Sequence, residues 1–167
     1  GLARISRLRK LRKAVRGKQA AIVASVGAVA ATEYGAAVNG ISDQEWDKLQ
    51  RIAASGMSPS AGGRSRTALF ALKGDPTWRA ATAPILQWTK AAWPDEEERK
   101  VHDLLSVEDL KDAWQAGSAD RAHLWTEDGS RRWNRCGGPI SALALSLERI
   151  NWHTEDGEVL VDDKGVR

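Results

Sequence analysis

The stretch ISDQEWDKLQRIAASG, residues 41–56, carries the clearest helix signal in the chain. Ser42 and Glu45 have the spacing of a capping box, in which each side chain bonds the backbone N–H of the other residue. The pattern predicts an amphipathic helix that begins after Ser42 and ends near Gly56. Its apolar stripe, at helical spacing, consists of Trp46, Leu49 and Ile52.

Similar signals on both sides of this stretch predict further helices. They cover residues 3–16, 18–32, 67–73, 75–93, 95–105, 106–114 and 139–150. Pro84 is expected to kink the helix over 75–93, because proline removes a backbone donor and clashes with the preceding turn. Gly35 and Gly40 bracket a short turn or strand-like piece.

The C-terminal part of the chain has turn signals of another kind. The tetrapeptide TEDG occurs at 126–129 and again at 154–157, which we interpret as repeated turn chemistry and not as a structural repeat. Apolar runs on both sides of the second copy predict a β-hairpin over 151–167. The fold class expected is therefore mainly α, a bundle of about six to seven helices with a small C-terminal β-hairpin.

Charge divides the chain into unlike parts. Residues 1–73 carry 13 Lys and Arg against 4 Asp and Glu, whereas the remaining 94 residues carry 12 against 18. Such a split indicates one electropositive surface that meets a polyanion and an acidic remainder that does not. We expect a basic helical subdomain over 1–56, a linker and short helix over 57–73, and an acidic helical region over 74–167.

The stretch ARISRLRKLRKAVRGKQ, residues 3–19, holds eight Lys and Arg and no Asp or Glu. Repulsion among these cations costs stability unless a polyanion relieves it, so we expect contact with a nucleic-acid backbone. A solvated charged face and a membrane-surface helix are the alternatives. The residues expected to contact phosphates lie in this stretch and in the linker: Arg4, Arg7, Arg9, Lys10, Arg12, Lys13, Arg16, Lys18, Arg64 and Arg66.

Eight tryptophans are many for 167 residues, and their positions suggest two roles. Those on apolar helical faces are expected in the core: Trp46, Trp78, Trp88 and Trp114. Those near helix ends or in irregular chain are candidates for base stacking: Trp93, Trp125 and Trp133. Trp133, which has three arginines close by in the sequence, is expected to be the most exposed of these.

No catalytic site, metal or cofactor is expected. The three histidines lie far apart and the single cysteine, Cys136, has no motif partner, so we expect it to be packed. In VLVDDKG, residues 159–165, the paired acids resemble those of a two-metal site, but turn chemistry explains Asp162 and Asp163 more simply. The chain is therefore expected to be no enzyme by itself and to take no small-molecule substrate.

The apolar run over 19–32 is too short to cross a bilayer, so a buried helix is expected there. The lone cysteine fits a reducing compartment, and an intracellular location, nuclear or cytoplasmic, is expected. Because the chain starts at Gly and stops just after a turn signal, we expect it to be a fragment of a longer protein.

The segment AIVASVGAVAATEYGAAVNGISDQEWDKLQRIAASGM, residues 21–57, resembles the region just after the palm in reverse transcriptases of retrotransposons without long terminal repeats. The likeness rests on Tyr34-Gly35, the capping Ser42, and Leu49-Gln50-Arg51. DPTWR (75–79) and GGPISALALSLERINW (137–152) resemble later parts of such open reading frames in protist retroelements. The chain departs from the family pattern on both sides of Tyr34-Gly35, with Thr32-Glu33 before and Val38-Asn39-Gly40 after.

This resemblance implies a non-catalytic thumb and connection segment of a polymerase whose palm is absent. Its partners would be the backbone of an RNA–DNA hybrid or RNA duplex and the remainder of the polymerase chain, with no membrane involved. The alternative function is a helical protein-interaction module that docks the apolar stripe of the basic helix on a partner.

Overall fold

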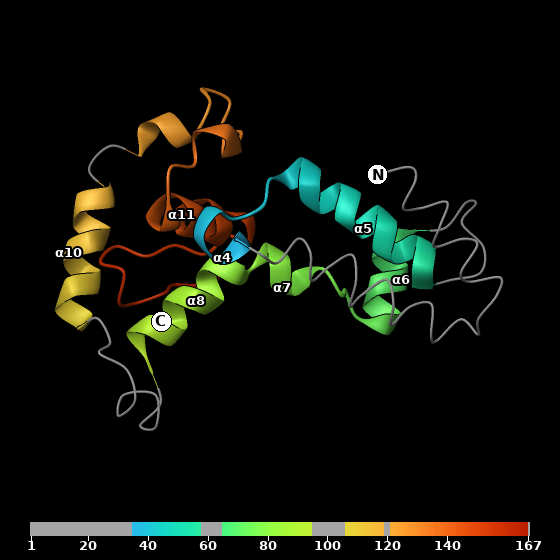
Figure 1. The fold of residues 1–167 in the computed structure, drawn as a ribbon, viewed down its shortest axis with the longest axis horizontal. Coiled ribbons are helices and arrows are strands. Elements are labelled where there is room, and N and C mark those ends of the chain that lie inside the picture. Colours follow the sequence, from blue (N-terminus) through green and yellow to red (C-terminus); the bar gives the residue numbers. More distant parts are fainter. Residues whose placement is uncertain (1–34, 58–64, 95–105, 119–120, 167) are drawn as a thin grey trace. The chain divides into compact units, whose positions relative to one another are not determined.

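The computed structural model describes residues 35–57, 65–94, 106–118 and 121–166. Within these ranges the chain is mainly helical, which confirms the expected class, and contains no β-strand. Its α-helices are α4 (Ala36–Asn39), α5 (Asp43–Met57), α6 (Arg66–Lys73), α7 (Trp78–Ala81), α8 (Ala83–Ala92), α10 (Val107–Ser118) and α11 (Pro139–Arg149) (Figure 1). Two 3₁₀ turns, η2 (Ala122–Leu124) and η3 (Trp133–Arg135), precede α11. The helices expected over 3–16, 18–32 and 95–105 lie outside the described residues.

The chain forms two compact units, one of which contains residues 41–81. In this unit α5 begins with the capping box, since the Ser42 N–H donates to Glu45 Oε2 (3.0 Å) and the Glu45 N–H donates to Ser42 Oγ (3.2 Å). Leu49, Ile52 and Ala53 form the buried side of α5. The neighbouring helix α6 is capped by Ser65, whose hydroxyl accepts the N–H of Ala68 (3.3 Å).

The second unit contains residues 35–40 and 82–167. Its core is formed mainly by α8, α10 and α11, with buried side chains that include Trp88, Trp114 and Leu143. Residues 142–147 of α11 are all buried, and the short helix α4 packs on α8 and α11 (Figure 1). The turn or strand-like piece expected between Gly35 and Gly40 is thus a helix, and both glycines have positive φ.

Pro84 breaks the chain more completely than expected. The helix predicted over 75–93 is divided into α7 and α8, and Pro84 lies in the first turn of α8. Proline is tolerated there because the first N–H groups of a helix have no intrahelical acceptor. A continuous helix would have required a backbone N–H donor at position 84, which proline lacks.

The predicted C-terminal β-hairpin is wrong. His153 and Val161 form one isolated antiparallel bridge, with N–H to carbonyl distances of 3.0 and 2.8 Å, and no strand extends from it. The backbone between them is bonded elsewhere: Asp156 Oδ1 accepts the N–H groups of Glu158 and Val159, and the Glu155 carbonyl accepts from Trp114. Because these backbone groups bond within the turn or to the core, they do not form the hydrogen-bond ladder of a β-hairpin.

Candidate nucleic-acid interface

Most of the cations predicted to contact phosphates lie outside the described residues. These are the eight basic residues of the stretch 3–19 and Arg64. Their assignment therefore stays a prediction. Arg66 is the one predicted phosphate contact that the structure describes, and it is the first residue of α6.

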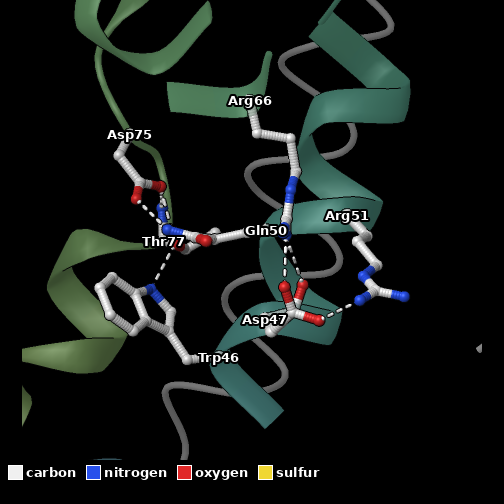
Figure 2. Close-up of polar contacts among 7 residues, drawn as sticks. All are labelled: Trp46, Asp47, Gln50, Arg51, Arg66, Asp75 and Thr77. Carbon is white, nitrogen blue, oxygen red and sulfur yellow. Dashed lines mark hydrogen bonds and ion pairs between the residues drawn. The ribbon is translucent and has the colours of Figure 1, made fainter. Parts of the chain in front are cut away.

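Arg66 is engaged inside its own unit (Figure 2). Its Nη1 lies 2.6 Å from Asp47 Oδ1 and 3.3 Å from the Asp47 carbonyl oxygen, while Arg51 Nη2 lies 2.7 Å from Asp47 Oδ2. The hydrogen bond from Arg66, with the positive charges of both arginines, lowers the pKa of the Asp47 carboxyl below its usual value. Arg66 thus connects α6 to α5, and a phosphate would have to compete with Asp47 for it.

A second set of polar contacts in Figure 2 connects α5 to the turn before α7. Gln50 Nε2 donates to Asp75 Oδ2 (2.8 Å), and Asp75 Oδ1 accepts from the N–H (2.8 Å) and hydroxyl (2.7 Å) of Thr77. The Trp46 indole N–H donates to Thr77 Oγ1 (2.8 Å). Thr77 is fully buried, so this set fixes the Asp75 turn on α5 and gives Gln50 a structural role.

The tryptophans of the second unit are mostly structural. Trp88 and Trp114 are buried, as predicted, and their rings meet edge to face at 6.1 Å. Their indole N–H groups donate to the carbonyls of Gly157 (2.7 Å) and Glu155 (3.0 Å). These interactions leave neither ring available for base stacking.

Two predictions about tryptophan exposure need correction. Trp78 was expected in the core, yet it is 47% exposed because the break before α8 ends its helix after one turn. Trp133 was expected to be the most exposed of the candidate stacking residues. It is instead partly buried against the core, with the Arg149 guanidinium carbon 4.5 Å from its ring centroid, whereas Trp93 is 50% exposed.

The second unit also contains a cleft of about 520 Å³, which no sequence pattern indicated. Arg121 lines it with its guanidinium carbon 4.2 Å from the centroid of the Trp114 ring, and burial lowers the pKa of this arginine. On another part of the lining, Glu148 Oε2 accepts the indole N–H of Trp125. Trp152, which is 36% exposed, also lines the cleft. These residues come from three separate stretches of the sequence, at 114, 121–125 and 148–152, and only the high tryptophan count pointed toward an aromatic site.

Cys136 is packed against the core, as expected. Its thiol donates to the Asn39 carbonyl (3.3 Å), and burial raises the pKa of the thiol above its usual value. Within the described ranges, no three His, Cys, Asp or Glu side chains are arranged to hold a metal ion. None of the helices described there has both the length and the apolar character needed to cross a membrane.

No protein-family model matches the chain, and no curated protein or solved structure matches it either.

Proposed function

We propose that the chain is a nucleic-acid-binding thumb and connection segment of a retroelement reverse transcriptase, which grips the template–primer backbone through its basic N-terminal stretch. The observation that carries this proposal is the acid-free run of eight cations over residues 3–19. A protein that neutralises many phosphates gains affinity by releasing counterions from the nucleic acid.

The acidic residues of the same basic part support the proposal. Residues 1–73 contain only four of them. Glu45 is bonded to Ser42 in the capping box, and Asp47 is paired with Arg51 and Arg66. Each of these two acids thus has partners within its own unit. Neither is required to neutralise the cations of residues 3–19.

Contacts of this kind position a protein on a duplex and do not specify its sequence. The segment would therefore hold an RNA–DNA hybrid or an RNA duplex, while the rest of the polymerase chain supplies the catalytic palm. By itself the segment would be no enzyme.

Binding of a fluorescent RNA–DNA hybrid, measured by anisotropy at several salt concentrations, tests the proposal. In the test variant, Arg9, Lys10, Arg12, Lys13 and Arg16 are replaced by Ala. The expected result is a loss of about 4.5 units from the slope of log K against log salt, since each of the five neutralised phosphates contributes about −0.9 in duplex DNA.

A second variant with the same change in net charge serves as the control. It replaces five exposed cations of the described residues with Ala: Arg79, Lys90, Arg132, Arg135 and Lys164. This control should keep a slope close to that of the unaltered chain. Equal slopes in all three proteins would contradict the proposal. Salt-insensitive binding to a protein partner that is lost in Leu8→Asp would favour the helical interaction module instead.

A further inference from the structure

The cleft of the second unit combines three kinds of chemistry on one surface. The space of about 520 Å³ is lined by the indole of Trp152, which is 36% exposed, the guanidinium of Arg121 and the carboxylate of Glu148. Sites for small ligands have volumes of roughly 300–1,000 Å³ and combine apolar or aromatic walls with a few polar groups. The cleft therefore has the size and the composition of a ligand site.

Trp152 provides the exposed aromatic surface of this cleft. The other tryptophans lining it, Trp114 and Trp125, donate their indole N–H groups to internal acceptors. Among the described residues, the Trp152 side chain has no such bond. Its exposed indole at the edge of a cleft offers a face on which a planar ring can stack.

Arg121 supplies a site for an anion. Its guanidinium covers the Trp114 ring, and among the described residues it forms no ion pair with a carboxylate. A guanidinium that lies on an aromatic ring still has its N–H donors for a further partner, and phosphate suits their planar fork. Partial burial of this charge costs free energy that an anionic ligand would offset.

Glu148 supplies acceptors close to the same surface. One of its oxygens accepts the Trp125 N–H, which fixes the carboxylate at the cleft wall. A carboxylate has about four lone-pair sites, so acceptors remain. The Watson–Crick edge of guanine presents two adjacent donors, N1–H and N2–H₂. The same edge of adenine presents one donor, N6–H₂, beside the N1 acceptor, and a carboxylate repels the lone pair of this nitrogen.

We infer that this cleft binds a guanine nucleotide, with the base stacked on Trp152, its Watson–Crick edge on Glu148 and its phosphate on Arg121. The nucleotide is either free or an unpaired residue of an RNA strand, since both present the same groups. The inference departs from the expectation that the chain takes no small molecule. It does not depend on the N-terminal basic stretch.

Calorimetric titration of the full chain with GMP, AMP and guanosine tests this site without any substitution. GMP should bind saturably, with an affinity about tenfold or more above that of AMP, because a bidentate base contact discriminates to this extent. Guanosine, which has no phosphate, should also bind more weakly. Absence of saturable binding up to about 1 mM, or equal affinities for GMP and AMP, would overturn the inference.

Three variants assign the contacts. Glu148→Gln keeps an oxygen that can accept from Trp125 but should remove the preference for GMP over AMP. Arg121→Gln should reduce GMP affinity to that of guanosine. Trp152→Ala should weaken GMP binding about tenfold, whereas Trp93→Ala, which removes a tryptophan that is 50% exposed and does not line the cleft, should not. Similar losses in Trp93→Ala and Trp152→Ala would overturn the assignment of the stacking residue.

The source of the nucleotide is distinguished by a competition experiment. If an RNA with an unpaired terminal guanine displaces GMP at a lower concentration than GMP itself, the site takes the end of a strand; if only GMP competes, the site takes the free nucleotide. Binding of the RNA–DNA hybrid should be unchanged in Glu148→Gln, and GMP binding should persist when the five N-terminal cations are removed. Failure of one site is thereby separable from failure of the other.

Discussion

The tetrapeptide TEDG occurs twice in the second unit, and the two copies have the same turn chemistry in different surroundings. In each copy the Asp carboxylate accepts the N–H of the residue two positions later, at 3.1 Å for Asp128 and 2.9 Å for Asp156. In each copy the Gly has positive φ, +80° for Gly129 and +83° for Gly157. The local sequence therefore determines the turn conformation, as expected of Thr, Asp and Gly.

The surroundings of the two copies differ in burial. The first copy is largely exposed, and a Cβ added to Gly129 would meet nothing within 4 Å. The second copy lies against the core, where Trp88 and Trp114 donate to the carbonyls of Gly157 and Glu155. The same four residues thus form a surface turn in one place and part of the core in the other, and only packing distinguishes them.

The largest effect is expected from Gly157→Ala. The new Cβ would lie 3.0 Å from Trp114 Cβ and 3.1 Å from Trp88 Cζ2, at a φ that L-residues rarely adopt. We expect a loss of about 2–5 kcal/mol in the free energy of unfolding, with roughly 1–2 from the backbone and 1–3 from overpacking. Urea denaturation followed by tryptophan fluorescence measures it.

Gly129→Ala is the matched control, because it meets the same backbone penalty without the packing penalty. It should cost only about 1–2 kcal/mol. The difference between the two substitutions then measures how tightly the second copy is packed. If both substitutions cost the same, the close approach of the tryptophans to Gly157 contributes nothing to stability.

Trp88→Phe should have the next largest effect. It keeps most of the apolar ring but removes the N–H that donates to the Gly157 carbonyl (2.7 Å), and Gly157 is buried. An unsatisfied buried carbonyl and a small cavity together should cost about 2–3 kcal/mol in the free energy of unfolding. Trp93→Phe, at an exposed position of the same unit, should change it by less than about 0.5 kcal/mol. Equal effects at the two positions would show that the bond to Gly157 is dispensable.

The helices were predictable where the sequence carries their caps. Ser42 with Glu45 forms the expected capping box where α5 begins, and Ser106 with Asp109 forms the same pair of bonds at the start of α10, near the predicted start of that helix. Such signals are local, so they need no knowledge of the tertiary fold. The prediction of a β-hairpin was wrong because backbone groups near the second TEDG copy bond to tryptophan and other side chains. Spacing in the sequence does not reveal these partners.

The candidate sites were less predictable for the same reason. Arg66 pairs with Asp47, which lies 19 residues away in the sequence. This pair exists only because α6 packs against α5. The cleft combines residues from α10, from the region around η2 and from both sides of the end of α11. Sequence periodicity shows which face of a helix is apolar, but not which distant side chains meet there.

The smallest effect concerns the Asp128 carboxylate of the first TEDG copy and depends on pH. The Thr126 hydroxyl and the N–H and hydroxyl of Ser130 bond to Asp128 and lower its pKa from 3.8 to about 2. Because the pKa is lower in the folded chain, the ionised carboxylate stabilises the fold above about pH 4, and this contribution is lost as pH falls toward 2. The wild type should therefore be more stable than Asp128→Asn at pH 6, with the two converging near pH 2 in urea denaturation. A constant difference between the wild type and Asp128→Asn across this range would contradict the assignment.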